Sequence, residues 1–308
     1  MDINRQNMTE FFQTLNAAFH AGMQSTGQRV TPEQVLLEQI AMMGRSSGAS
    51  AMHGWLSQIG GMREWIGDRV VANILSGKLS IVNRKFEKTI EVPRDDIDDD
   101  NHGIYTPLVS AMGVSAGMLW MKLAIDALVA NGEWADGLPF FGTDRTYSGQ
   151  AIVNATASAL DATTFAAARV AMMSYKLDGD EPAEVLPVVL LVGPKLRDTA
   201  WNIVKNDFVS AGTGKGGNLQ NPNKDAVALA VSPRLVGAHE DKWFLLGEQT
   251  GFRGIYVQKR KDPKFTGLFS DTDENVFWRD KFVYGTDARG EAFLTFPHLI
   301  YSGKVISE

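Results

Sequence analysis

The sequence predicts an α+β protein in which a long helix and extended strands form one part and a mixed helix-and-strand subdomain forms another. Three observations lead to this fold class. Residues 106–131 keep one apolar helical face, residues 82–92 alternate with the period of a strand, and helix and strand signals alternate after Gly132. With 308 residues, 44% of them hydrophobic, the chain is long enough to bury one large core or two smaller ones.

Residues 1–54 are predicted to form an N-terminal arm. Phe12, Leu15 and Phe19 recur at helical spacing, and Thr31-Pro32-Glu33-Gln34 offers the N-cap, the first-position proline and the capping-box glutamine of a second helix. The small polar run from residue 44 to 50 has the composition of a flexible connector. We therefore expect two short helices before residue 44 that need not pack on the main body.

Residues 55–94 are predicted to form a long projecting hairpin. Val82, Phe86, Ile90 and Val92 fall on one face of a strand, with charged and polar residues on the other. The apolar run at residues 65–75 is the expected partner strand, although residues 69–75 also fit a helix. A hairpin of this kind exposes sheet edges, so it normally needs a partner.

A long spine helix is predicted after the acidic run at residues 95–100. Thr106-Pro107 can cap and start it, and Asn131-Gly132 can end it. At roughly 25 residues this helix would span about 37 Å, which is longer than most globular helices.

The second half of the chain is predicted to alternate helix and strand before ending in strands. Expected in order are a helix at 157–175, a strand at 185–192, a helix at 195–208 and strands at 226–231, 243–246 and 254–257. A last hairpin is expected to join residues 276–278 and 282–284 to residues 292–294 across a turn at Asp287-Ala288-Arg289-Gly290.

Composition narrows the function classes. The 30 Lys and Arg residues against 36 Asp and Glu give a net charge of -6, so the chain lacks the broad positive field of a dedicated nucleic-acid binder. The absence of cysteine excludes disulfides, thiolate nucleophiles and Cys-based metal sites, and fits a reducing cytoplasm. Without a basic start leading into an apolar run, or any apolar stretch of about 18 residues, we expect neither secretion by a signal nor membrane insertion.

One motif suggests a serine hydrolase. Gly113-Val114-Ser115-Ala116-Gly117 matches the G-x-S-x-G string of a nucleophile elbow, and Asp180, His239 and His298 could follow Ser115 in the required chain order. The elbow requires a buried strand directly before the serine, whereas this string lies inside the predicted spine helix. A serine hydrolase using Ser115 is therefore the alternative, not the preferred, interpretation.

Two further motifs are incomplete. Asp96, Asp98 and Asp100 resemble the start of a calcium loop, but Asn101 and Pro107 stand where glycine and glutamate are needed. The glycine-rich run at residues 212–218 lacks the Ser or Thr after Lys215 that a P-loop requires, and it follows a predicted helix. The five histidines show no ligand spacing, so no catalytic, cofactor or metal site is predicted.

Several ordered runs resemble the major head subunit of phage Mu and of related prophages. They cover about residues 53–302 and are weakest near 145–184 and 209–225. The runs are His53-Gly54-Trp55-Leu56, Met62-Arg63-Glu64-Trp65-Ile66-Gly67-Asp68-Arg69, Asn83-Arg84-Lys85-Phe86-Glu87, Gly103-Ile104-Tyr105-Thr106-Pro107, Asp136-Gly137-Leu138-Pro139-Phe140-Phe141-Gly142-Thr143-Asp144, Trp243-Phe244-Leu245-Leu246 and Asp271-Thr272-Asp273-Glu274-Asn275-Val276-Phe277-Trp278-Arg279-Asp280.

The resemblance implies the tailed-phage capsid fold named after phage Hong Kong 97. Its parts would map onto an arm at 1–54, an extended hairpin loop at 55–94, a peripheral domain with the spine helix at 95–139, an axial domain at 140–240 and closing peripheral strands at 241–308. The implied protein is a major capsid protein that self-assembles into an icosahedral shell around double-stranded DNA, is made in the host bacterial cytoplasm, and has no enzymatic activity, cofactor or membrane. Its implied partners are copies of itself in hexamers and pentamers, a scaffold protein, the portal and head-decoration proteins.

On this interpretation the functional residues lie at contacts between subunits. Large rings on projecting elements are costly unless a neighbour covers them, so Phe12, Trp65 and Phe86 are the candidate anchors. Four basic residues are candidates for ion pairs with the acidic run of an adjacent copy; the pairs would join Arg63, Arg69, Arg84 and Lys85 to Asp95, Asp96 and Asp98. A second alternative, besides the hydrolase, is another phage structural module such as a tail-tube or decoration protein.

Overall fold

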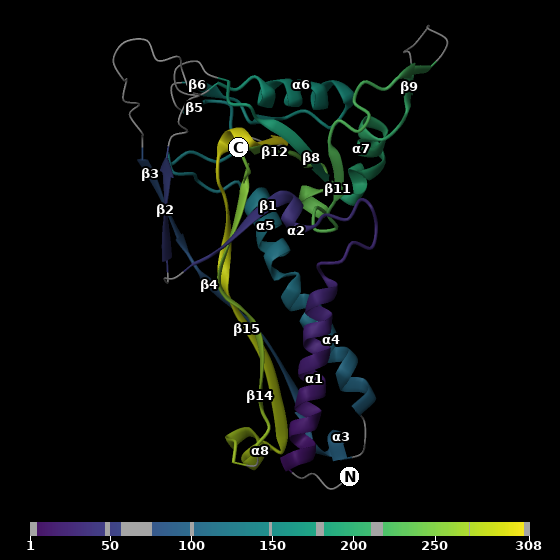
Figure 1. Cartoon of the computed structure of the whole chain (residues 1–308), viewed down its shortest axis with the longest axis vertical. Helices are drawn as coiled ribbons and strands as arrows, with labels where there is room; N and C mark the ends of the chain where they lie inside the picture. Colours follow the sequence, from purple (N-terminus) through teal and green to yellow (C-terminus); the bar gives the residue numbers. More distant parts are fainter. Residues whose placement is uncertain are drawn as a thin grey trace.

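The chain forms a broad domain and a long limb that extends from it (Figure 1). The computed structural model describes residues 5–46, 50–56, 76–98, 102–147, 150–176, 182–210, 218–270 and 272–304. The broad domain holds a six-stranded sheet with helices α6 and α7, whereas the limb holds helices α1 and α4 beside three long strands. Both helices and sheets contribute, as the predicted α+β class requires.

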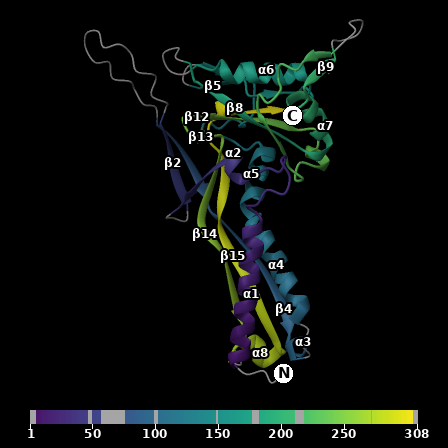
Figure 2. The same cartoon turned by 45° about the vertical axis from the view of Figure 1, so that its right-hand side comes forward.

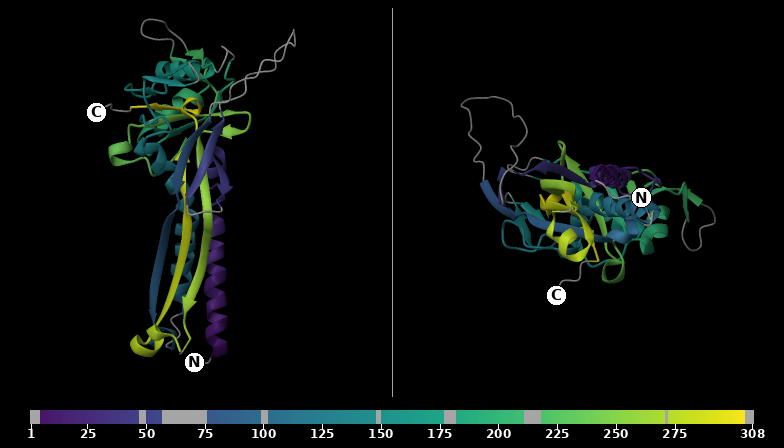
Figure 3. Two further views of the ribbon diagram at one scale, coloured as in Figure 1. Left: turned by 90° about the vertical axis from the view of Figure 1, so that its left-hand side faces the viewer. Right: turned by 90° about the horizontal axis from the view of Figure 1, so that it is seen from below.

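A four-stranded sheet of order β1-β14-β15-β4 runs the length of the limb (Figure 3). Strands β14 (Ile255–Leu268) and β15 (Lys281–Leu294) are antiparallel, β4 (Arg84–Pro93) pairs antiparallel with β15, and β1 (Ala41–Arg45) runs parallel to β14. Along β15 every second residue is buried, because one face of the sheet packs on helices. Phe86, Ile90 and Val92 lie on this inner face as predicted, but Val82 is 65% exposed.

The predicted C-terminal hairpin is wrong in two places. Residues 274–279 form helix α8 (Glu274–Arg279), not a strand, and the expected turn at Asp287-Ala288-Arg289-Gly290 lies in the middle of β15. Gly290 permits a close packing contact there, since a Cβ at this position would clash with the carbonyl oxygen of Gln258 and lie 2.6 Å from the Trp120 ring. Gly290 therefore allows Trp120 of α5 to pack closely against β15, and the strand continues through this position.

The predicted spine helix is two helices. Helix α4 (His102–Gly117) and α5 (Leu119–Ala130) meet at Met118 with a bend of 41°. The helix begins at His102, so Pro107 lies inside it and is not its first residue, while the predicted end is confirmed by the left-handed Asn131 (φ 45°). Among the described helices none alone has the length and apolar character of a membrane span; α4 and α5 reach it only when joined across the bend.

Helix α1 (Arg5–Ser25) packs parallel to α4 along the limb (Figures 1 and 2). The contact depends on three glycines. A Cβ on Gly22 would clash with the Ser110 carbonyl, and a Cβ on Gly113 would clash with the Phe19 carbonyl. A Cβ on Gly117 would lie 2.8 Å from the Met23 carbonyl. The expectation that the N-terminal helices need not pack on the body is therefore wrong for α1, because these glycines bring its backbone directly onto α4.

The segment after α1 also differs from the prediction. Thr31-Pro32-Glu33-Gln34 forms a turn, and the only helix that follows before residue 41 is the four-residue α2 (Leu37–Ile40). Residues 41–45 form β1 instead of a connector, since Ala41 pairs with Ile255 and Arg45 with Lys259 on β14. This pairing attaches the segment after α1 to the first residues of β14, at the end of the limb next to the broad domain.

The predicted pairing of the hairpin is wrong for the strand at residues 82–92, because most of this strand is β4, which pairs with β15. A different hairpin precedes it. Strands β2 (Ser50–Leu56) and β3 (Ser76–Val82) pair antiparallel from Ser50 with Val82 to Leu56 with Ser76. The predicted partner strand at residues 65–75 lies outside the described residues.

The broad domain buries its sheet on both faces. The sheet has the order β11-β8-β12-β16-β7, with β13 (Phe252–Arg253) added to β12. Alternate residues of the central strands face opposite cores: Leu190, Val192 and Leu245 lie under α6 and α7, whereas Leu191 and Phe244 face α5. The elements are α6 (Ala162–Met173), β8 (Leu186–Val192), α7 (Arg197–Val204), β11 (Ala228–Val231), β12 (Trp243–Gln249), β16 (Ile300–Gly303), β7 (Ala155–Thr156), and the small pairs β5 (Arg145–Tyr147) with β6 (Gln150–Ile152) and β9 (Phe208–Ser210) with β10 (Asn218–Gln220).

Candidate inter-subunit surfaces

The described residues contain no nucleophile elbow. Ser115 is exposed in the last turn of α4, where an elbow would require a turn after a strand, and Gly113 and Gly117 serve the packing of α1. His298 is fully buried, its Nε2 lies 3.0 Å from Gln249 Oε1, and burial lowers its pKa to about 4. The geometry therefore contradicts the serine-hydrolase interpretation. No group of three His, Asp or Glu residues suited to a metal ion occurs in the described part of the chain.

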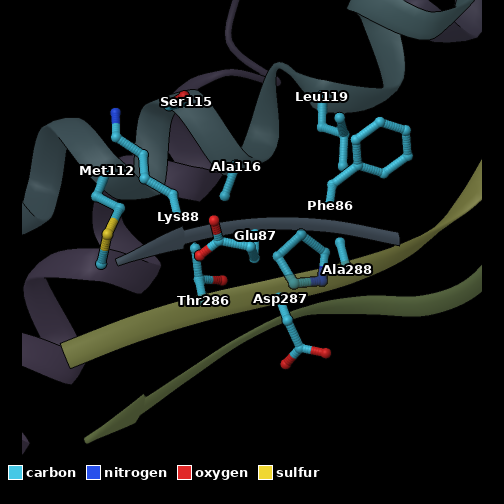
Figure 4. Close-up of a pocket in the computed structure, with 11 residues that line it drawn as sticks. Phe86, Glu87, Lys88, Met112, Ser115, Ala116, Leu119, Thr286, Asp287 and Ala288 are labelled. Atoms are coloured by element: carbon cyan, nitrogen blue, oxygen red, sulfur yellow. The ribbon is translucent and has the colours of Figure 1, made fainter. Parts of the chain in front are cut away.

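A groove of about 170 Å³ opens between α4 and the limb sheet (Figure 4). Its floor is mostly apolar and its rim is charged. The lining residues are Phe86, Glu87, Lys88, Met112, Ser115, Ala116, Leu119, Pro263, Thr286, Asp287 and Ala288. The groove lies beside the bend between α4 and α5, and the small side chains of Ala116, Thr286 and Ala288 are among its lining residues.

The edge strand β4 forms one side of this groove. It occupies the end of the sheet order, so the main-chain groups on its outer side have no neighbouring strand among the described residues. Phe86, a predicted anchor, is half-buried here and packs partly on the core. Lys88 is exposed, and its side chain extends past the groove toward α4 (Figure 4). The groove thus presents an apolar floor, an open strand edge and a rim on which Lys88 lies among the carboxylates of Glu87 and Asp287.

The predicted basic residues have different surroundings. Arg84 binds Glu291 of its own chain through two hydrogen bonds, the longer one 2.9 Å from Nη2 to Oε1, and this partner raises the Arg84 pKa. Lys85 is exposed on the same strand. Arg63, Arg69 and the predicted anchor Trp65 lie outside the described residues. Arg84 already has a partner within the subunit, which leaves Lys85 as the described basic candidate for a contact with a neighbour.

Phe12 belongs to an aromatic cluster of its own subunit. Its ring stacks on Phe269 at 4.9 Å and on Phe265 at 5.5 Å between ring centres, and on Tyr284 at 6.3 Å. The side chain is half-buried, so part of it remains exposed to solvent. Its role at a subunit contact stays a prediction.

The acidic run begins in the short helix α3 (Arg94–Asp98) at the far end of the limb. Asp95 is exposed, whereas Asp96 accepts a hydrogen bond from the Tyr105 hydroxyl. Burial and this carboxylate raise the Tyr105 pKa to about 12. The side chain of Asp98 and residues 99–101 lie outside the described part. Asp95 therefore remains available to a neighbour, while Asp96 is engaged locally.

The sequence interpretation missed a further apolar surface at the end of the limb. Phe277 and Trp278 on α8 are 71% and 74% exposed. They were assigned to a strand because three apolar residues in succession fit a short strand. Asp273 before Glu274 was the available signal of a helix start.

The comparisons with known proteins agree on one family. The model of the family described as the Mu-like prophage major head subunit gpT matches residues 8–159, 147–235 and 230–306. The Mu-like prophage FluMu major head subunit of Haemophilus influenzae is 28% identical over 273 residues, which are 88% of this chain and 67% of that protein. The major capsid protein of Escherichia phage Mu is 36% identical over 127 residues, 40% of each chain.

Solved structures share the fold. The procapsid of bacteriophage JBD30 matches with a TM-score of 0.56 at 24% identity, covering 99% of this chain and 77% of that one. The virus-like particle from Pyrococcus furiosus matches with a TM-score of 0.54 at 13% identity, covering 94% and 97%. The predicted tailed-phage capsid fold is therefore confirmed.

Proposed function

The chain belongs to the family of Mu-like prophage major head subunits, and we propose that it builds the head shell through its projecting hairpin, its open strand edge and the groove beside α4. It is a major capsid protein; the observation that carries this function is the family match along nearly the whole chain, together with the capsid fold. A tail-tube or decoration protein would explain neither the family match nor the capsid fold.

The proposed shell encloses double-stranded DNA without recognising its sequence. The net charge of -6 supports this, because a chain without a broad positive field holds DNA by enclosure and not by phosphate contacts. We further propose assembly through hexamers and pentamers, with a scaffold protein, a portal and decoration proteins as partners, and synthesis in the host bacterial cytoplasm. The proposed function needs no catalytic step, so the purified chain should show no esterase activity that Ser115→Ala abolishes.

The proposed contacts follow from surfaces that one subunit leaves incomplete. The outer edge of β4 can accept main-chain hydrogen bonds from a neighbouring segment, and the groove beside it can take an apolar side chain. Lys88 at the rim would favour a carboxylate on that segment. Trp65 in the predicted hairpin loop and Phe12 on α1 remain proposed anchors, with Phe86 on the receiving side.

Ion pairs between neighbouring subunits would then determine how their surfaces align. We choose Lys85 and Asp95 for this test, since both are exposed and neither has an ion-pair partner among the described residues, whereas Arg84 binds Glu291. Lys85→Glu and Asp95→Lys should each impair assembly, and the double variant should restore it. If the double variant does not restore shells, Lys85 and Asp95 do not form an ion pair between subunits. Arg63 and Arg69 can be tested against Asp96 and Asp98 in the same way.

The direct test is negative-stain electron microscopy with light scattering on the recombinant protein, alone and with the neighbouring scaffold gene. Closed shells, or rings that convert to them, are expected. A persistent monomer or small dimer under both conditions would contradict the proposal. Replacing Leu119 by a larger Trp should fill the groove and reduce shell yield, whereas Val170→Trp on the exposed surface of α6 provides the control.

A further inference from the structure

The two legs of the hairpin β2–β3 leave the limb from opposite edges of its sheet. Strand β1, which precedes β2, is the first strand in the order β1-β14-β15-β4, and β4, which follows β3, is the last. Figure 1 shows β2 and β3 diverging from the long limb strands. The legs nevertheless pair with each other, beginning with Ser50 and Val82. They therefore meet at the root of the hairpin, between the end of β1 and the start of β4.

Buried polar side chains lie at this root. We call them the root network; it consists of Ser46 directly after β1, Asn83 between β3 and β4, and Gln258 on β14. Their exposed fractions are 8%, 4% and 1%. Asn83 Nδ2 donates to Ser46 Oγ at 3.2 Å, and Gln258 Nε2 donates to Asn83 Oδ1 at 2.7 Å. The Asn83 side chain thus joins one leg to the other and both legs to the limb sheet.

The main chain of both legs is bound at the same place. The Ser46 N–H donates to the Lys259 carbonyl at 2.9 Å, which extends the pairing of β1 with β14 by one residue. Arg260 Nη1 donates to the Ser46 carbonyl at 3.1 Å, and Arg289 Nε donates to the Asn83 carbonyl at 3.4 Å. These bonds hold each leg to the limb, whereas the bond between Asn83 and Ser46 holds the legs to each other.

Apolar packing at the root is incomplete. A pocket of about 180 Å³ lies beside Ile81 of β3, and its other lining residues include Ala127 and Ala130 of α5 and Phe293 of β15. Val82, the last residue of β3, is 65% exposed. Open space beside a strand permits more than one direction of the hairpin, and a two-stranded hairpin is only marginally stable by itself. The direction of the hairpin therefore needs a determinant other than apolar packing.

Hydrogen bonds suit this role because their geometry is directional. A buried amide that loses its partner is left with unpaired polar atoms, so the hairpin directions that satisfy all three side chains are favoured. We propose that Asn83 is a positioning residue that sets the direction of the hairpin relative to the limb. Its consequence for assembly rests on the proposed function: a hairpin held in one direction loses less conformational entropy when it binds a neighbouring subunit.

The absence of cysteine allows spin labels to be placed at chosen pairs of positions. Lys78→Cys on β3 with Lys264→Cys on β14 reports the distance from the hairpin to the limb in the free subunit, by double electron–electron resonance. Adding Asn83→Ala should widen this distance distribution at least twofold. Thr89→Ala is the matched control and should leave the width unchanged, because this exposed hydroxyl lies on β4 and bonds Glu87, outside the root network.

A second label pair separates positioning from general loosening. Met173→Cys on α6 with Lys264→Cys spans the broad domain and the limb without the hairpin, and Asn83→Ala should leave this distribution unchanged. Equal widening of both distributions, or no widening of the hairpin distance, would overturn the proposal. If Asn83→Ala does not fold, Ser46→Ala removes only the 3.2 Å bond and should widen the hairpin distance to a smaller extent. An unchanged width in Ser46→Ala would then overturn the proposal.

Replacing both amides together tests the hydrogen bond itself. Asn83→Leu with Gln258→Leu leaves neither amide without its partner, so this double variant should unfold near the parent temperature while the hairpin distance stays wide. A narrow distance would overturn the proposal, because apolar contacts alone would then fix the hairpin.

Shell yield tests the consequence for assembly. Asn83→Ala should lower the yield of shells several-fold, and a normal yield with a widened distance would overturn the link between hairpin direction and assembly. If the parent chain forms no shells, the proposed function fails. The distances measured in free subunits still decide the role of Asn83 in that case, so the two failures are distinguishable.

Discussion

The broad domain and the limb bury their sheets in different ways. In the broad domain both faces of the sheet are covered within one chain, by α6 and α7 on one side and by α5 on the other. In the limb one face packs on α1 and α4, the alternate residues of β15 remain partly exposed, and β4 leaves an open edge. The broad domain therefore covers both faces of its sheet within one subunit, whereas the limb has surface left for neighbours.

The largest expected effect lies in the closed core of the broad domain. Phe165 on α6 is fully buried, so Phe165→Ala should lower the free energy of unfolding by about 3–5 kcal/mol through lost burial and a cavity. Urea unfolding of the free subunit measures this. Val170→Ala, on the same helix but 64% exposed, should change stability by no more than about 0.5 kcal/mol. Equal losses in both variants would mean that this core is not self-contained.

Acid should weaken the broad domain before it affects the limb. Burial lowers the folded pKa of His298 from 6.5 to about 4, so between these values the unfolded chain binds a proton that the folded chain does not. Stability should thus fall as the pH drops from about 6.5 and reach a loss of about 3 kcal/mol near pH 4.

The measurement is the free energy of unfolding at several pH values for the parent and for His298→Gln. The variant should lose most of this pH dependence between pH 6.5 and 4. An unchanged slope would show that other groups cause it.

In the limb, the contact between α1 and α4 should be sensitive to a single methyl group. Gly113→Ala should cost about 1–3 kcal/mol, because its Cβ would clash with the Phe19 carbonyl, partly offset by the better helix propensity of alanine. Limited proteolysis should cut α1 faster in this variant. Gly103→Ala on the same helix meets no atom within 4 Å and should be neutral or slightly stabilising. Similar proteolysis of both would contradict the proposed packing role of Gly113.

The smallest effect is expected inside the limb core. Tyr284 is fully buried, and its hydroxyl has no hydrogen-bond partner among the described residues. Tyr284→Phe should therefore change stability by less than about 1 kcal/mol and can raise it, since no satisfied polar group is lost. Thermal unfolding tests this. A loss well above that value would show that the hydroxyl is bonded in the folded protein.

Sequence reasoning succeeded where a periodic pattern or a helix stop signal was enough to decide the local structure. Phe86, Ile90 and Val92 predicted the inner face of β4, and Asn131-Gly132 predicted the end of α5. It failed where tertiary packing reassigns a residue: Gly290 fits Trp120 and does not make a turn, and Gly113 admits α1 and does not form an elbow. A sequence shows that a glycine is present but not which surface approaches it.

The surfaces for assembly were only partly predictable. Phe86 lies at a groove, but the groove is lined by residues of four separate elements, α4, β4, β14 and β15, together with Leu119 of α5, and their approach could not be predicted from sequence. Arg84 was predicted to pair with a carboxylate of a neighbouring subunit, yet it binds Glu291 of its own chain, more than 200 residues later in the sequence. Phe277 and Trp278 were assigned to a strand, so their outward direction could not be foreseen.

The order of strands in the limb has a consequence for synthesis of the chain. Strand β1 pairs with β14 and β4 with β15, so both early strands wait for partners that leave the ribosome near the end of translation. The α1–α4 pair can form much earlier, since all of its residues precede residue 118. A nascent subunit would therefore carry unpaired strand edges for most of its synthesis, which makes premature association between growing chains the main hazard and gives molecular chaperones a defined target.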